Sequence, residues 1–193
     1  MIQWAQNFGY NIDFEKWQEL WSRNYKMTMA TSYKENLYKM FYRWHLSPDR
    51  LSKMYSNRPS KCWKCHKKTG TYYYLWWTCD KVKNFWNKIH IWLVKIIKRN
   101  VYFRPELFLL GIIPESVDKQ NVYLILHILT ATRIIYAQYW KKEEIPTDQE
   151  TIKKILYRAK MDRLTLKIKG KEDTKYYQTW DLFYQWLEGC CID

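Results

Sequence analysis

The sequence predicts a mainly α-helical fold, a helical bundle with a small cysteine-rich, aromatic knuckle or hairpin inserted between helices. Apolar residues recur at helical spacing along several stretches of the chain. Hydrophobic residues make up 47% of the 193 positions, which is enough to bury a core. Three of the five cysteines lie in the short aromatic and basic stretch from Cys62 to Cys79, so this stretch interrupts the helical pattern.

Three helices are expected before the cysteines. The first covers residues 13–24, where Asp13 can cap the first turn. Ser32 and Glu35 have the spacing of a capping box and predict the start of the second helix. The Ser47-Pro48 pair places an N-cap before a proline at the first helical position, which predicts a short third helix.

The middle of the chain holds the two strongest helical patterns. Residues 80–99 carry a single apolar stripe, with the lysines mostly on other faces. Residues 118–142 are apolar most of the way round, so we expect this helix in the core. Residues 72–77, by contrast, read either as a β-favouring segment or as a buried entry into the following helix.

Two further helices are expected near the C-terminus. Thr147 and Glu150 form a second capping box and predict the start of one of them. In residues 164–171 apolar residues recur at every second position, which fits either a short strand or the fraying end of that helix. A last helix is expected over residues 174–188, with Gly189 as its cap.

Large aromatic residues and two histidines fall on these apolar stripes. Rings at helical spacing pack in a core far more often than they bind a ligand, and we therefore treat His45 and His127 as structural as well. The rings expected in the core are Trp17, Trp44, Trp76, Trp77, Phe85, Trp86, Trp180 and Trp186.

The positive charge of the chain is concentrated in one segment. The formal net charge is +14, and residues 58–99 hold eleven Lys or Arg against one Asp. Such a concentration favours a polyanion as partner. We divide the chain into N-terminal helices (1–57), a basic cysteine-rich segment with its following helix (58–100) and a C-terminal helical subdomain (101–193), or read it as one continuous domain.

The cysteine spacing predicts a metal site. Cys62 and Cys65 form a C-x2-C knuckle and Cys79 follows, giving three sulfur donors where tetrahedral Zn²⁺ takes four ligands. His66 is the candidate fourth ligand, while His90 would have to fold back from the next helix. The alternative is that the cysteines are small buried apolar residues.

Basic and aromatic residues around the cysteines are the candidate nucleic-acid contacts. Lysines neutralise phosphates, and exposed rings can stack on unpaired bases. The alternatives that involve no ligand are a solvated helix face for the lysines and core packing for the rings. The candidates are Lys61, Trp63, Lys64, Lys67, Lys68, Tyr72, Tyr73, Lys81, Lys83 and Lys88.

Three motifs carry a family resemblance. Residues 38–54 read YKMFYRWHLSPDRLSKM, residues 62–86 contain C-W-K-C, L-W-W-T-C and K-V-K-N-F-W, and residues 103–114 read FRPELFLLGIIP. Together they resemble the C-terminal region of the reverse transcriptases of non-LTR (long interspersed element) retrotransposons. The resemblance covers most of the chain.

The resemblance implies a zinc-knuckle-like segment that lies downstream of the polymerase and binds the element's RNA. In that family a histidine lies five residues before the last cysteine, and Tyr74 occupies the position here. The expected role is an accessory module that binds RNA or single-stranded nucleic acid, with the missing polymerase domain as a further partner. The other expectation is a structural or interaction domain, a truncated remnant with a decayed zinc site.

No catalytic residue is predicted, and the chain is not expected to be an enzyme. It has no Asp-Asp pair for polymerase metals, and it lacks the G-x-S-x-G, P-loop and G-x-G-x-x-G motifs. We expect a fragment or truncated reading frame of a retroelement. Without a visible signal peptide or membrane span, we also expect an intracellular location in the nucleus, the cytoplasm or both.

Overall fold

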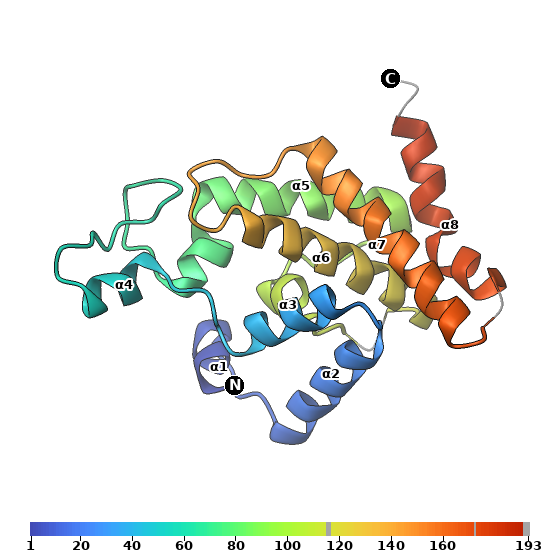
Figure 1. The fold of residues 1–193 in the computed structure, drawn as a ribbon, viewed down its shortest axis with the longest axis horizontal. Coiled ribbons are helices and arrows are strands. Elements are labelled where there is room, and N and C mark those ends of the chain that lie inside the picture. The colour runs from blue at the N-terminus through green and yellow to red at the C-terminus, as the bar shows by residue number, and fades with distance from the viewer. Residues whose placement is uncertain (115–116, 172, 191–193) are drawn as a thin grey trace.

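The chain folds as a helical assembly that surrounds one long central helix (Figure 1). A computed structural model describes residues 1–114, 117–171 and 173–190. These residues form eight α-helices and two π-helical turns, with no strand among them: α1 (Ile2–Phe8), α2 (Phe14–Lys26), α3 (Thr31–Phe41), α4 (Pro48–Met54), η1 (Tyr74–Thr78), α5 (Asp80–Ile97), η2 (Glu106–Leu110), α6 (Lys119–Gln138), α7 (Asp148–Ile168) and α8 (Asp173–Cys190).

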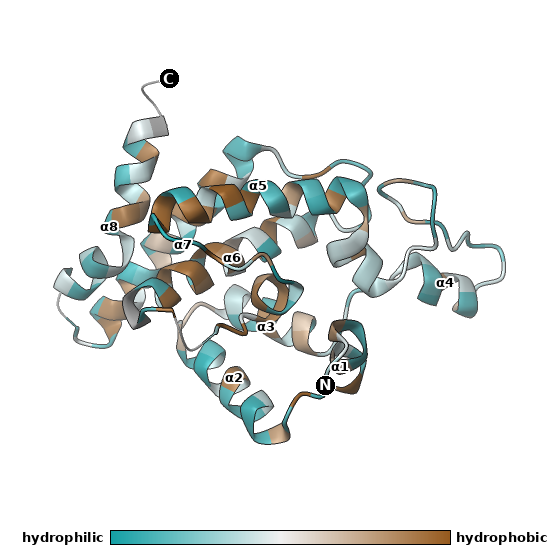
Figure 2. Cartoon of the chain, turned by 180° about the vertical axis from the view of Figure 1, so that it is seen from behind, coloured by the Kyte–Doolittle hydropathy of each residue, from teal (hydrophilic) through white to brown (hydrophobic). Residues whose placement is uncertain are grey.

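The central helix is α6, which contacts α3, α7, α8 and η2. Its residues from Leu124 to Tyr136 are all buried, which confirms the prediction of a core helix. Figure 2 shows the apolar residues concentrated on α5 and α6. The end of the molecule that carries α4 and the cysteine loop projects beyond this core (Figure 1).

Several local signals in the sequence predicted element boundaries correctly. Asp13 caps α2 by accepting hydrogen bonds from the backbone N–H groups of Glu15 and Lys16. Thr147 and Glu150 form the predicted capping box of α7. The apolar stripe of α5 is buried along its length, at Val82, Phe85, Trp86, Ile89, Leu93, Ile96 and Ile97.

Other boundaries were predicted wrongly. Helix α3 begins at Thr31, so Ser32 lies inside it and caps nothing. Helix α8 continues past Gly189 to Cys190. Of the two readings for the segment after residue 164, the helical one holds, because α7 runs to Ile168. Helix α1 was not predicted at all, although its Trp4 is fully buried.

The segment before Cys79 is a π-helical turn rather than a strand. The backbone N–H of Cys79 donates to the carbonyl of Tyr74, five residues earlier, at 2.9 Å. Leu75, Trp76 and Trp77 are buried in succession. A strand would turn alternate side chains to opposite faces, whereas this wide turn places three consecutive apolar side chains in the core. The reading as a buried entry into α5 is therefore the one that holds.

Most of the aromatic residues expected in the core are there. Trp76, Trp77, Phe85, Trp86 and Trp180 are buried, whereas Trp17 and Trp186 pack against the core at its edge.

Trp44 was predicted wrongly, because its side chain is 61% exposed. Helix α3 ends at Phe41, and Arg43 takes a left-handed conformation with φ 52°. The helical stripe that would have buried Trp44 therefore stops one turn too early.

One continuous buried cluster contains residues from each of the three segments, from Trp4 through Trp76 to Phe183. The division at residues 57 and 100 stays a prediction. Among the described residues, no helix combines the length and apolar character that a membrane span requires.

Candidate metal centre and the basic surface around it

The cysteine loop is a tight hairpin that leads from α4 to η1. A single antiparallel bridge pairs Lys61 with Thr69, and the N–H of Cys62 donates to the carbonyl of Lys68 at 2.8 Å. These contacts confirm the expected hairpin between helices. The loop closes against α4 at Gly70, where a Cβ would lie 2.7 Å from Pro48 Cγ, so only glycine fits there.

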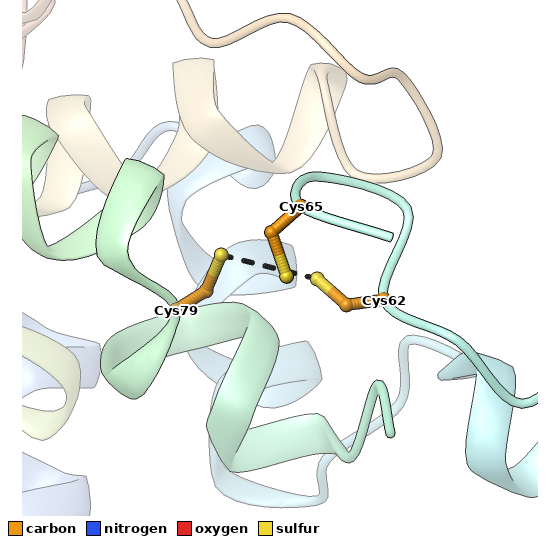
Figure 3. A group of neighbouring side chains, drawn as sticks. All are labelled: Cys62, Cys65 and Cys79. Atoms are coloured by element: carbon orange, nitrogen blue, oxygen red, sulfur yellow. Dashed lines mark hydrogen bonds between the residues drawn. The ribbon is translucent and has the colours of Figure 1, made fainter. Parts of the chain in front are cut away.

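The loop brings the three predicted cysteines together. The sulfur atoms of Cys62, Cys65 and Cys79 all lie within 4.8 Å of one another, and those of Cys62 and Cys79 are 3.9 Å apart (Figure 3). Two sulfurs bound to one tetrahedral zinc at about 2.3 Å each would be about 3.8 Å apart. The three cysteines therefore lie close enough to hold a metal ion.

Backbone N–H groups point at the sulfurs. Those of Lys64 and Cys65 point at Cys62, those of Lys67 and Lys68 at Cys65, and those of Lys81 and Val82, in the first turn of α5, at Cys79. Hydrogen bonds of this kind stabilise the thiolate form that binds metals.

The three thiols differ in their acidity. Burial raises the pKa of Cys62 to about 12 and also raises that of Cys79. Burial acts in the same direction on Cys65, but the hydroxyl of Tyr74 and the N–H groups of Lys67 and Lys68 outweigh it and lower the pKa of Cys65 to about 6. Cys65 is thus the thiol that most readily becomes a thiolate.

Tyr74 lies beside the cluster, next to Cys65. Its hydroxyl is 3.4 Å from the sulfur of Cys65. Ligands at about 2.3 Å for sulfur and about 2.0 Å for oxygen would be about 3.5 Å apart around a tetrahedral ion. The hydrogen bond with Cys65, burial and the nearby charges of all three thiols raise the pKa of Tyr74 further above its usual value. The centre thus offers three sulfur donors and one neutral hydroxyl.

The structure does not bring His66, the candidate fourth ligand, into this cluster. The backbone of His66 is left-handed, with φ 57°. The ring is 59% exposed, and its Nε2 lies 3.4 Å from Glu143 Oε2. His90 is also engaged elsewhere, because its Nε2 lies 2.6 Å from the carbonyl oxygen of Val101.

Lys64 was predicted as a nucleic-acid contact, and the structure contradicts this. The side chain is fully buried, and its ammonium donates to the carbonyls of Tyr139 (2.6 Å), Lys142 (2.6 Å) and Glu144 (2.9 Å). An ammonium has three N–H donors, so all of them are used. Lys64 fastens the cysteine loop to the segment between α6 and α7.

Tyr72 is likewise a core residue rather than a base-stacking one. It is 2% exposed, and its ring packs among Trp4, Trp76 and Trp140. Tyr73 is half-buried against Phe8 of α1. Trp63 is partly open to solvent and meets Trp140 edge-on, with ring centres 6.2 Å apart.

The remaining candidate lysines are exposed: Lys61, Lys67 and Lys68 on the loop and Lys81, Lys83 and Lys88 on α5. Two of them form surface ion pairs, Lys81 with Glu143 at 3.0 Å and Lys88 with Asp148 at 2.7 Å. The other four have no acidic partner among the described residues. The cysteine loop and α5 therefore both present lysines to solvent.

A buried polar cluster that the sequence did not reveal joins the helices far from the cysteines. Arg158 Nε donates to His127 Nδ1 at 2.7 Å, and Arg158 Nη1 donates to Thr28 Oγ1 at 2.8 Å. His127 Nε2 faces Asp162 Oδ1 at 3.6 Å, and Trp180 Nε1 donates to Asp162 Oδ2 at 2.9 Å. These residues come from four separate parts of the chain, and no spacing in the sequence connects them.

A scan of the chain against protein-family models found no match.

Proposed function

We propose that the cysteine loop and the start of α5 form a surface that binds RNA or another single-stranded nucleic acid. In this proposal the chain is an accessory module that resembles the C-terminal region of a non-LTR retrotransposon reverse transcriptase. It carries neither polymerase nor endonuclease active site and acts by binding rather than by catalysis.

The observation that carries the proposal is the arrangement of exposed lysines around the cysteines. Lys61, Lys67, Lys68 and Lys83 face solvent without an acidic partner among the described residues. Residues 58–99 hold eleven cations and a single acidic residue. Phosphate binding by such a surface releases counterions, so the affinity should fall steeply as salt is added.

We propose zinc as the metal of the centre, because three clustered cysteine sulfurs suit Zn²⁺ better than the harder Mg²⁺ or Ca²⁺. When bound, the ion would crosslink the loop to the N-terminus of α5. It would thereby hold the lysines of both segments in one fixed surface.

The test is a salt titration of binding to a fluorescent single-stranded RNA, read by anisotropy. Each lost phosphate contact lowers the slope of log affinity against log salt by about 0.7 for single strands. The double variant Lys67→Glu, Lys68→Glu should therefore bind more weakly and lose about 1.4 from the slope.

The matched control is Lys153→Glu, Lys160→Glu, which makes the same charge change on exposed positions of α7. Equal loss of affinity in both double variants would show only a response to net charge. Unchanged binding by the loop variant would refute the proposed surface.

One observation favours a second candidate, a protein-interaction role. An aromatic groove lies between Met1, α2 and the end of α3, where Phe14 is 59% exposed and Tyr42 is 65% exposed beside Trp17 and Trp21. The polymerase domain of the same element would be the partner. Retained binding to that domain by a Phe14→Ser, Tyr42→Ser variant would exclude this groove.

A further inference from the structure

A groove next to the metal centre joins aromatic rings to cations. It lies between α4 and the cysteine loop and has a volume of about 520 Å³, which is large enough for a nucleotide-sized group. Its aromatic residues are Tyr55 and Trp63, and its cations are Arg58 and Lys141. Only Trp63 of these four was singled out from the sequence.

The rings of the groove are accessible, unlike most rings nearby. Tyr55 is 54% exposed, and Trp63 is partly open to solvent. Tyr72, Trp76 and Trp77, by contrast, are buried in the core. A base that approaches the basic end of the molecule can therefore stack on the rings of the groove but not on those three.

The cations of the groove are free to bind an anion. Arg58 and Lys141 are both exposed, and neither forms an ion pair within the described residues. Asp49, in the adjacent helix α4, is paired with Lys53 at 3.3 Å. A phosphate on either side of a stacked base would thus meet unpaired positive charge.

The cysteine loop holds the groove in shape. Trp63 stands between Cys62 and Lys64, which are both fully buried, so the backbone that carries its ring is anchored on both sides. Opposite it, the N–H of Asp49 donates to the carbonyl of Gly70 at 3.2 Å and holds α4 against the loop. A groove that is already formed loses little conformational entropy when a ligand enters.

We propose that this groove receives one unpaired base of a single-stranded nucleic acid, stacked on Trp63 and Tyr55, with Arg58 and Lys141 on the flanking phosphates. The inference rests on the proposed function and deepens it, because it predicts that the module distinguishes single strands from duplexes. The exposed lysines alone would bind both.

The experiment uses the full chain and two RNAs of equal length, a single strand carrying 2-aminopurine and a blunt duplex. Loss of one stacked base should weaken binding to the single strand by about 5- to 150-fold. We expect this loss in both Trp63→Leu and Tyr55→Leu, together with loss of the 2-aminopurine quenching. Binding to the duplex should change less than about twofold.

A second groove variant and a control variant make the result interpretable. Tyr55 is more than half exposed, so Tyr55→Leu tests stacking even where Trp63→Leu disturbs the loop. Tyr157→Leu is the matched control, because it removes a ring of 47% exposure from α7 and should leave binding unchanged.

The outcomes separate the two proposals. Single-strand binding that resists both groove variants but falls in Lys67→Glu, Lys68→Glu overturns the stacking groove and leaves the basic surface intact. Equal losses on single strand and duplex also overturn the groove. Absence of RNA binding by the unmodified chain overturns both.

Discussion

The hydroxyl of Tyr74 lies 3.4 Å from the sulfur of Cys65, close to the distance expected between two ligands of one tetrahedral zinc. The hydroxyl of Tyr74 thus lies beside the three-sulfur cluster, at a distance from Cys65 that a fourth ligand could have. A neutral phenol is a weak donor, since zinc in proteins is bound by thiolate, imidazole or carboxylate groups. The cluster therefore offers three sulfur donors, with a weak donor beside one of them.

Tyr74→His should raise zinc affinity by at least about tenfold, because a neutral imidazole nitrogen replaces the hydroxyl as the possible ligand. Loss of a hydrogen-bond partner of a zinc ligand typically changes the affinity about 10- to 100-fold, and a change of the ligand itself should have at least the smaller of these effects. Zinc competition against a chromophoric chelator measures the change. Co²⁺ substitution should also show the visible bands of a tetrahedral site.

Tyr74→Phe is the control for this variant, and it should bind zinc no more tightly than the unmodified chain. Cys62→Ser should lose the metal, because it removes a buried sulfur donor. Equal zinc affinity in the histidine and phenylalanine variants would show that position 74 does not reach the ion.

Lys64→Met should lower the free energy of unfolding by about 2–4 kcal/mol, because three carbonyls lose a charged donor and two of their hydrogen bonds are as short as 2.6 Å. Chemical denaturation measures this change in the free energy of unfolding. Lys67→Met removes an exposed lysine from the same loop and should change stability by less than about 0.5 kcal/mol. Equal effects of the two variants would contradict the buried role of Lys64.

Arg158→Met should be among the most destabilising single changes, with a loss of about 3–5 kcal/mol, because it removes the buried donor to His127 and Thr28 and the positive charge near Asp162. Arg163→Met lies on the same helix and breaks only an exposed ion pair with Asp173, so it should cost less than about 1 kcal/mol. A small loss in Arg158→Met, measured by thermal or chemical unfolding, would show that the cluster repacks.

His45 should make stability depend on pH. Burial beside Trp76 and Trp140, together with the charge of Lys39, lowers the pKa of His45 to about 4. The unfolded chain binds a proton at this residue near pH 6.5, so stability is lost as the pH falls from about 6.5 to 4, by up to about 1.4 kcal/mol per pH unit.

His45→Phe should remove this contribution and keep the one from His127, whose pKa burial and Arg158 also lower. The free energy of unfolding should be measured from pH 8 to pH 4 for both proteins. Its slope against pH should be the same for the two above pH 7 and should differ below that. An unchanged slope between pH 6.5 and 4 would place the acid sensitivity elsewhere.

Local signals were sufficient to predict most of the helices, although not α1. The cap at Asp13, the box at Thr147 and Glu150 and the stripe of α5 act between residues within a few turns of one another, so the sequence displays both partners. The C-x2-C spacing and the position of Cys79 likewise predicted a three-sulfur cluster. All of these features depend on short distances along the chain.

Only the tertiary structure decided which side chains of the basic segment face solvent. Lys64 resembles Lys67 in sequence, yet it is buried by carbonyls 75 to 80 residues away. Tyr72 is enclosed by Trp4 and Trp140 in the same way. A lysine or tyrosine can serve a surface or a core equally well, because it joins a polar end to an apolar stem, and its role depends on contacts that form only when distant segments pack together.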